Sequence, residues 1–153
     1  MIDKTSELAL QALVYLARHP SSEPLSAAVL AERLNLSPTY LAKVTRMLAK
    51  ADILLSHRGA RGGVSLARRA EEITLLQVVE SCQGITLKNY CRDVDEPELG
   101  CGYHRAMLEL REGIRGTLGR WTLADLLQPP ADASGSGVHP PCSMANAFEV
   151  SIS

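Results

Sequence analysis

The period of the hydrophobic pattern changes once along the chain, near residue 51, and this change restricts the folds that the chain can adopt. In three stretches before that point, apolar residues recur every three or four positions, as on the buried face of an α-helix. After it, apolar residues alternate with others over Ile53 to His57 and over Val64 to Leu66, as in half-buried β-strands. The sequence therefore predicts a mainly α fold with one small β-hairpin after the third helix.

The second and third predicted helices are short and close together. The first helix is predicted over Ser6 to Arg18. Ser26 is an N-cap residue for the second, whose pattern stops at residues 35–37. Ser37 is predicted to cap the third, with Pro38 at the first helical position, where its missing N–H costs nothing. Two helices joined by about three residues are typical of a helix-turn-helix.

The predicted hairpin has the composition of a wing. Three glycines in its loop tolerate positive φ, and Arg58 and Arg61 lie at its tip, where a hairpin can place them in a DNA groove. The alternative is a glycine-rich surface loop with incidental arginines, which the complete run from Arg58 to Gly63 disfavours. The alternation puts Ser56 and Ser65 on one face, and on the other face Ile53, Leu55, His57, Val64 and Leu66. We assign Ser56 and His57 to strand and backbone support, with His57 as a surface residue rather than a ligand.

The charge is divided between the two halves of the chain. Residues 1–70 hold ten Lys and Arg against five Asp and Glu, whereas residues 71–153 hold six against twelve. A basic half suits a polyanion such as DNA, whose phosphates supply the sequence-independent part of affinity. No stretch approaches the roughly 20 apolar residues of a membrane helix, and the first residues do not have the pattern of a signal peptide, so we expect a cytoplasmic protein.

The third predicted helix has two contrasting faces. Leu41, Val44, Leu48 and Ala51 fall on the side that can pack on the first two helices. The opposite side carries hydroxyl and cationic groups that can contact phosphates or base edges, namely Thr39, Lys43, Arg46 and Lys50, together with Ala42. The alternative is a merely solvated helix face, which the preceding turn and the following wing disfavour.

The sequence of the acidic half predicts one long helix that lies outside the helix-turn-helix and the wing. A shorter helix is expected from Ile73 to Cys82, closed by Gly84, and a last short one from Thr122 to Leu127. Between them, the helix from Cys101 to Gly119 carries an apolar stripe that a second copy could cover in a C2 dimer: Met107, Leu110, Ile114, Leu118 and Trp121. The expected parts are a DNA-binding domain (1–84), an irregular loop (85–100), the dimerisation and short terminal helices (101–128) and a disordered tail (129–153).

The segment from Leu54 to Arg68, LLSHRGARGGVSLAR, resembles the wing signature of the Rrf-type regulators, the family of IscR, NsrR and RirA. SPTYL at residues 37–41 and ITL at 73–75 extend the resemblance, in order, over about residues 1–127. It implies a dimeric winged helix-turn-helix transcription factor with a double-stranded DNA operator as partner. Many members sense iron–sulphur cluster status, nitric oxide, iron or redox state.

The resemblance also implies DNA contacts. Thr39, Lys43 and Arg58 lie where family members touch DNA, and Ala42 stands where some relatives carry a base-reading acidic residue, so their operator preference is not carried over. The full predicted contact set is Ser37, Thr39, Tyr40, Lys43, Arg46, Lys50, Arg58 and Arg61.

The resemblance also implies a cofactor site, but this chain has only part of the ligand pattern of its relatives. Cluster-binding relatives present three cysteines around this loop and then a histidine, whereas this chain has Cys91, Cys101 and His104 and lacks the middle cysteine. Thiolates suit iron, and histidine can replace one at a cluster iron. Glu7 matches the position from which some relatives donate an acidic ligand across the dimer, so the resemblance implies a [2Fe–2S] cluster held by Glu7, Cys91, Cys101 and His104. Asp95 or Glu96 is the local substitute for the missing thiol; a degenerate site or a mononuclear ion such as zinc is the alternative.

Three functions therefore stay open: a cluster-sensing regulator, a cluster-free winged-helix repressor, and a partner-binding protein of the same fold. An enzyme is not predicted. The sequence has no Ser/His/Asp set, no Gly-rich phosphate loop after a strand, and no paired carboxylates on rigid elements.

Overall fold

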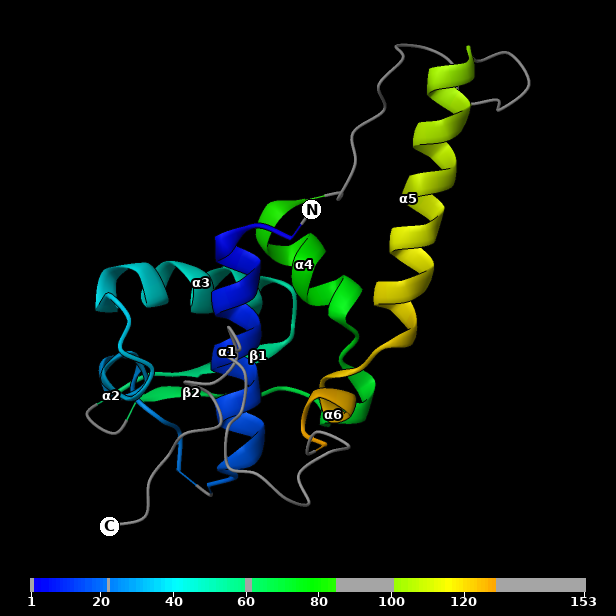
Figure 1. The fold of residues 1–153 in the computed structure, drawn as a ribbon. Helices are drawn as coiled ribbons and strands as arrows, with labels where there is room; N and C mark the ends of the chain where they lie inside the picture. Colours follow the sequence, from blue (N-terminus) through cyan, green and yellow to red (C-terminus); the bar gives the residue numbers. More distant parts are fainter. Residues whose placement is uncertain (1, 22, 60–61, 85–100, 129–153) are drawn as a thin grey trace, which may run out of the picture.

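The structure is a computed structural model that describes residues 2–21, 23–59, 62–84 and 101–128. It is mainly helical with one antiparallel hairpin, as predicted (Figure 1). The elements in chain order are α1 (Lys4–Arg18), α2 (Ala27–Arg33), α3 (Pro38–Lys50), β1 (Leu54–His57), β2 (Gly63–Leu66), a 3₁₀ turn (Ala70–Glu72), α4 (Leu75–Gln83), α5 (Gly102–Arg120) and α6 (Leu123–Leu126).

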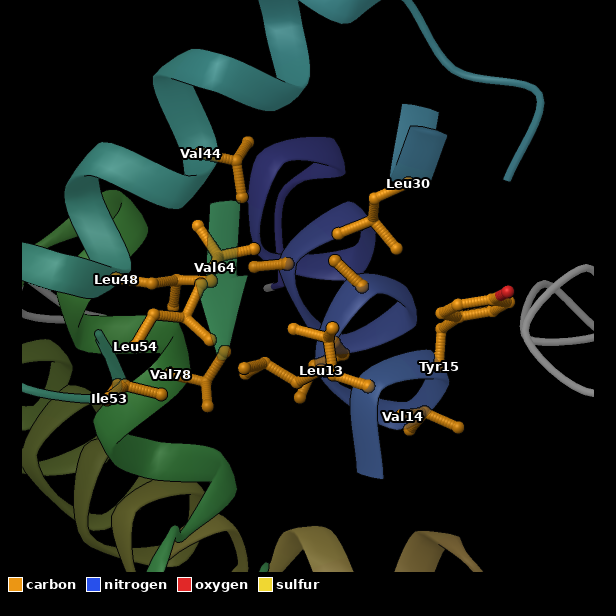
Figure 2. Packing of buried hydrophobic residues seen from close by; sticks show 14 of the residues in the cluster. Leu13, Val14, Tyr15, Leu30, Val44, Leu48, Ile53, Leu54, Val64 and Val78 are labelled. Atoms are coloured by element: carbon orange, nitrogen blue, oxygen red, sulfur yellow. The ribbon is translucent and has the colours of Figure 1, made fainter. Parts of the chain in front are cut away.

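The core of the head, which we define as residues 2–84, is built around α1. All residues of α1 from Leu8 to Leu16 are buried, because other elements surround this helix on every side. Figure 2 shows side chains from α2, α3, β2 and α4 converging on it, including Leu30, Val44, Val64 and Val78. The core is aliphatic, and burial of each such side chain is worth about 1.5–3 kcal/mol.

The helix ends follow local rules. The Asp3 carboxylate accepts a hydrogen bond from the Ser6 N–H at 2.7 Å and so caps α1. Thr74 and Gln77 form a reciprocal capping box at the start of α4, and Gly84, with φ 76°, ends that helix. These signals place the ends within two residues of the prediction for α1 and α4.

The hairpin is present, and the faces of β2 are as predicted, but those of β1 are shifted by one residue from the prediction. The register pairs Leu54 with Leu66 and Ser56 with Val64, so these residues share the inner face, whereas Leu55 is 50% exposed. The exposure of Leu55 is contrary to the predicted alternation, whereas His57, on the same face, is exposed as expected of a surface residue beside two arginines. The reason is that Ile53 is buried in the turn before the strand, and the alternation begins only at Leu54.

The long helix α5 lies beside α4 and extends beyond the head (Figure 1). Of its nineteen residues, all of which are described, only His104 is buried. Its C-terminal end is joined to the head because α6 follows at once and places Leu123 in the core. No helix in the described part of the chain is both long enough and apolar enough to span a membrane.

Candidate nucleic-acid interface

The packing face of α3 agrees with the prediction at three of its four positions. Leu41, Val44 and Leu48 are completely buried against the core. Ala51 is exposed, contrary to the prediction, because it is the C-cap residue, where the helical spacing no longer sets the direction of the side chain. The buried face fixes how α3 lies on the head and therefore which residues point outward.

The opposite face of α3 is exposed as predicted. Thr39, Lys43, Arg46 and Lys50 all lie on the surface, and we call these four residues the recognition face. They are separated by four, three and four positions, so they form one ridge about 16 Å long. Three cations and a hydroxyl on one ridge can contact successive phosphates and base edges.

The first turn of α3 differs in detail from the prediction. Ser37 occupies the N-cap position, but its side chain makes no capping hydrogen bond, so the predicted capping role is wrong and the exposed hydroxyl is left to face solvent. Tyr40 is half-buried, and its hydroxyl lies 2.6 Å from the Thr5 hydroxyl of α1. If Thr5 donates in this pair, the Tyr40 O–H can still donate to a phosphate oxygen.

The turn between α2 and α3 is held by backbone geometry. Asn35 has φ 52°, a left-handed conformation that asparagine tolerates well. The Leu36 N–H donates to the Ala31 carbonyl at 2.8 Å, and Leu34 is completely buried. These contacts fix the angle between the two helices, as a helix-turn-helix requires.

The wing places Arg58 directly after β1, exposed to solvent. Gly59 has φ 107°, which favours glycine, and the Gly62 N–H closes the loop by donating to the Gly59 carbonyl at 2.9 Å. Arg61 lies outside the described residues. On the outer face, His57 Nε2 lies 2.9 Å from Ser65 Oγ and links the two strands.

Leu25, before α2, anchors the wing, a role that sequence reasoning missed. It forms an antiparallel bridge with Val64 through two hydrogen bonds of 3.0 and 2.8 Å. A Cβ added to Gly63 would lie 2.4 Å from the Leu25 carbonyl oxygen, so only glycine fits there. The Gly62–Gly63 pair was a signal of such a close approach, but the sequence could not identify the partner.

The predicted cluster ligands are only partly described. Cys91 and the substitutes Asp95 and Glu96 lie outside the described residues. Cys101 is the exposed N-cap residue of α5, and His104 is 3% exposed in its first turn. Glu7 pairs with Lys4 at 3.2 Å on α1. Within one protomer the described residues contain no group of three or more His, Cys, Asp or Glu able to hold a metal ion, so Glu7, Cys101 and His104 are not brought together.

Cys82 has the character of a core residue. It lies at the edge of the hydrophobic core, and burial raises the pKa of its thiol because a thiolate is poorly solvated there. The Ser81 hydroxyl opposes this rise in pKa, and the nearby Asp3 carboxylate adds to it. Cys82 is therefore unsuited to be a reactive thiol.

A helix-turn-helix whose second helix presents a cationic ridge, followed by an arginine-bearing hairpin, defines the class of winged helix-turn-helix DNA-binding proteins. The model of the Rrf2 family, described as an iron-dependent transcriptional regulator, matches residues 2–129. The chain therefore belongs to the Rrf2 family of transcriptional regulators.

Individual relatives agree with this assignment. The chain is 32% identical over 119 residues to Protein rrf2 of Nitratidesulfovibrio vulgaris, which covers 76% of this chain and 79% of the relative. Its structure is similar to that of CymR, the global cysteine regulator of B. subtilis, with a TM-score of 0.67, 26% identity, and coverage of 83% of this chain and 95% of CymR. It is also similar to T. potens IscR, with a TM-score of 0.67, 28% identity, and coverage of 89% and 92%.

Family membership fixes the coarse function. Rrf2 regulators bind DNA, are homodimeric and are not enzymes. The chain is thus a DNA-binding transcriptional regulator, as the sequence predicted.

Proposed function

We propose that this protein recognises one operator sequence as a homodimer, with the recognition face of α3 in the major groove and the wing on the adjacent backbone. The single observation that carries this proposal is the exposure of all four recognition-face residues on one side of α3. Recognition helices of this class read base edges from their N-terminal residues, so Thr39 and Lys43 are proposed to face bases. Arg46, Lys50, Ser37, Tyr40, Arg58 and Arg61 are proposed to contact phosphates.

The second protomer is proposed to cover the apolar side of α5. Leu110, Ile114 and Leu118 line an open groove together with Ile2 from the start of the chain. An apolar face of this length is normally buried, and two copies of one helix can bury each other about a two-fold axis. The dimer would present two recognition faces to two half-sites in the cytoplasm.

Selection of genomic DNA fragments tests the operator proposal. We expect the wild-type protein to enrich fragments that share one sequence, in oxidising or in reducing buffer. The variant Lys43→Ala/Arg46→Ala/Arg58→Ala should enrich none, because it lacks the main cations of the interface. Arg120→Ala removes an equally exposed cation from α5 and should behave as wild type. If the wild type enriches no sequence in either buffer, the proposal is wrong.

The sensing function is proposed to reside in a [2Fe–2S] cluster held by Cys91, Cys101 and His104 of one protomer and Glu7 of the other. His104 supports it: its Nε2 atom is buried and has no hydrogen-bond partner among the described residues, as expected of a nitrogen that needs a metal. Cys101 supplies a thiol at the start of the same helical turn. When bound, a cluster supplies a one-electron redox centre that also reacts with nitric oxide.

A cluster-free regulator is the second candidate. The observation that favours it is the missing middle cysteine, and the similarity to CymR, a cysteine regulator, agrees with it. In that case His104 would be a core residue and Cys91 and Cys101 ordinary thiols.

Purification without oxygen distinguishes the two candidates. A brown protein with about two iron and two sulphide per subunit, lost in Cys91→Ala and Cys101→Ala, would support the cluster. A colourless wild-type protein without metal would contradict it and support the cluster-free regulator.

A further inference from the structure

The helix α5 is joined to the head at its C-terminal end by a short backbone bridge. The Leu75 N–H donates to the Trp121 carbonyl at 2.9 Å, and the Leu123 N–H donates to the Ile73 carbonyl at 2.8 Å. The connection from Trp121 to Thr122 is extended rather than helical. A bridge of two hydrogen bonds on an extended connection fixes the position of the end of α5, but it constrains the tilt of the helix only weakly.

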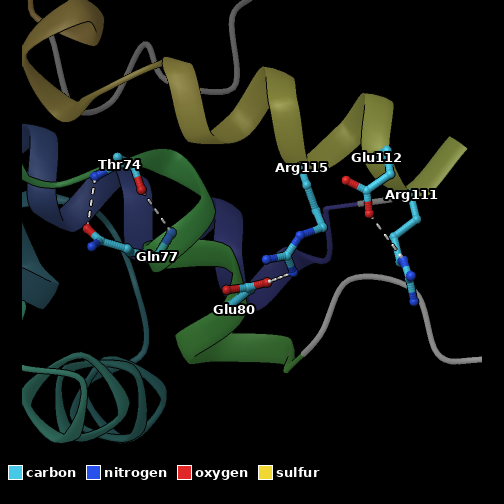
Figure 3. Close-up of polar contacts among 6 residues, drawn as sticks. All are labelled: Thr74, Gln77, Glu80, Arg111, Glu112 and Arg115. Atoms are coloured by element: carbon cyan, nitrogen blue, oxygen red, sulfur yellow. Dashed lines mark hydrogen bonds and ion pairs between the residues drawn. The ribbon is translucent and has the colours of Figure 1, made fainter. Parts of the chain in front are cut away.

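A second attachment lies six positions earlier on α5. Arg115 Nη1 donates a hydrogen bond to Glu80 Oε1 of α4 at 2.8 Å, and the two side chains also form an ion pair (Figure 3). Six helical residues correspond to about 9 Å along the axis, so this contact is well separated from the bridge. By contrast, the ion pairs Arg69–Glu71 and Arg111–Glu112 join neighbours in the sequence and link no two elements.

The two glycines between the bridge and this ion pair contribute no side chain to the contact between α4 and α5. A Cβ added to Gly119 would meet only the Leu76 side chain, at 3.7 Å, among the described atoms. A Cβ added to Gly116 would meet none of them within 4 Å. Because the Arg115–Glu80 contact lies about 9 Å from the backbone bridge, the two attachments together hold the angle between α4 and α5.

We infer that Arg115 and Glu80 are positioning residues that set the angle between each head and its α5, and thereby the spacing of operator half-sites that the dimer accepts. This inference rests on the proposed dimeric operator binding. A helix of nineteen residues is a lever about 28 Å long, so a tilt of about 7° moves its end by about 3.4 Å, the rise of one base pair. Neither residue belongs to the recognition face or the wing.

The test measures affinity for a series of operators whose half-site spacing is changed by one or two base pairs. We expect the wild type to lose about tenfold or more in affinity for each base pair of change, and Arg115→Met to lose about threefold or less, because the released head adapts to other spacings. Affinity for an isolated half-site, which a general loss of fold would lower, should stay within about twofold of wild type.

Further variants ensure that the test does not depend on whether Arg115→Met folds correctly. Glu80→Gln removes the charge from the other side and should broaden the spacing profile as Arg115→Met does. The exchange Glu80→Arg/Arg115→Glu should restore the narrow profile, and Arg120→Met is the matched control that should leave it unchanged. A wild-type protein that binds no duplex overturns the proposed function and this inference together. If the wild type binds DNA and the spacing profiles of Arg115→Met and Glu80→Gln are as narrow as its own, this inference is wrong and the proposed function stands.

Discussion

The head and the helix α5 differ in how far their apolar side chains are buried within one protomer. In the head, four helices and the hairpin, together with Leu123 of α6, enclose side chains such as Leu13 and Leu48 completely. On α5, Leu110 is 48% exposed, and Trp121, immediately after the helix, is 46% exposed. The head is therefore complete within one protomer, whereas α5 presents a surface that remains to be covered.

This contrast separates the free energy of folding, which depends on the head, from the free energy of association, which depends on α5. Substitutions in the head core should change the unfolding of each protomer, and substitutions on the open side of α5 should change association. The cations proposed to contact DNA follow the same division, since the recognition face and Arg58 lie on the head. Stability and DNA contact are thus separated from dimerisation, and the predictions below test that separation.

The largest expected effect is in the core. Leu13→Ala should lower the free energy of unfolding by about 2–5 kcal/mol at any protein concentration, because it leaves a cavity beside α1. Denaturant unfolding followed by circular dichroism measures it. Leu55→Ala, on the exposed side of the hairpin, should cost no more than about 0.5 kcal/mol. Equal costs for the two variants would contradict the description of the core.

The next effect concerns the open side of α5. Leu110→Asp should raise the dissociation constant of the dimer about 100-fold or more, because burial of a leucine is worth about 1.5–3 kcal/mol and is lost in both copies. Sedimentation equilibrium measures the change. Leu55→Asp places the same charge on an equally exposed leucine of the head and should leave the dimer intact. If Leu110→Asp dimerises as tightly as the wild type, α5 does not form the dimer interface.

Two glycine substitutions sharpen the comparison, because they should act with opposite signs. Gly63→Ala should destabilise the protein by about 1–3 kcal/mol, since the added Cβ would meet the backbone of Leu25. Gly116→Ala adds a methyl group where no described atom lies within 4 Å, and alanine should stabilise the helix by up to about 1 kcal/mol. Thermal unfolding of both variants measures these changes. A destabilised Gly116→Ala would mean that a partner backbone approaches α5 there.

The smallest effect is a difference in thiol reactivity. Because burial raises the pKa of Cys82, its thiolate forms only at higher pH, and alkylation at pH 8 should modify Cys101 about tenfold faster or more. Raising the pH should speed the reaction of Cys82 over a higher range than that of an ordinary thiol. Peptide mass spectrometry of chelator-treated protein separates the two cysteines. Comparable rates in the folded protein would place Cys82 at the surface.

Local patterns predicted most of the fold. Helical spacing was sufficient to separate the buried and exposed faces of α3, because residues such as Leu41 and Lys43 differ in both polarity and position. Helical spacing failed at Ala51, where α3 ends, and strand alternation failed at Leu55, where β1 begins, because the period changes within one or two residues there. The 3₁₀ turn Ala70–Glu72 was missed for the same reason, since three residues carry no periodic signal.

Contacts between distant residues could not be predicted. The bridge between Leu25 and Val64, the hydrogen bond between the Thr5 and Tyr40 hydroxyls and the ion pair between Glu80 and Arg115 each join residues 35 or more positions apart. A single sequence does not indicate which distant residues pair, because many residues in the chain could make an equivalent contact with each of these groups. The predicted DNA-contact residues depended on local spacing and the family resemblance, whereas the cluster ligands depended on the resemblance alone.

The salt dependence of operator affinity is the decisive test of the proposed interface, in which Arg46 of the recognition face and Arg58 of the wing neutralise DNA phosphates while Lys43 faces the bases. We predict that the slope of log affinity against log salt concentration becomes shallower in Lys43→Ala/Arg46→Ala/Arg58→Ala, by about 0.9 for each phosphate contact removed in each protomer. Arg120→Ala should keep the wild-type slope. A triple variant with both the slope and the affinity of the wild type would show that DNA binds elsewhere on the protein.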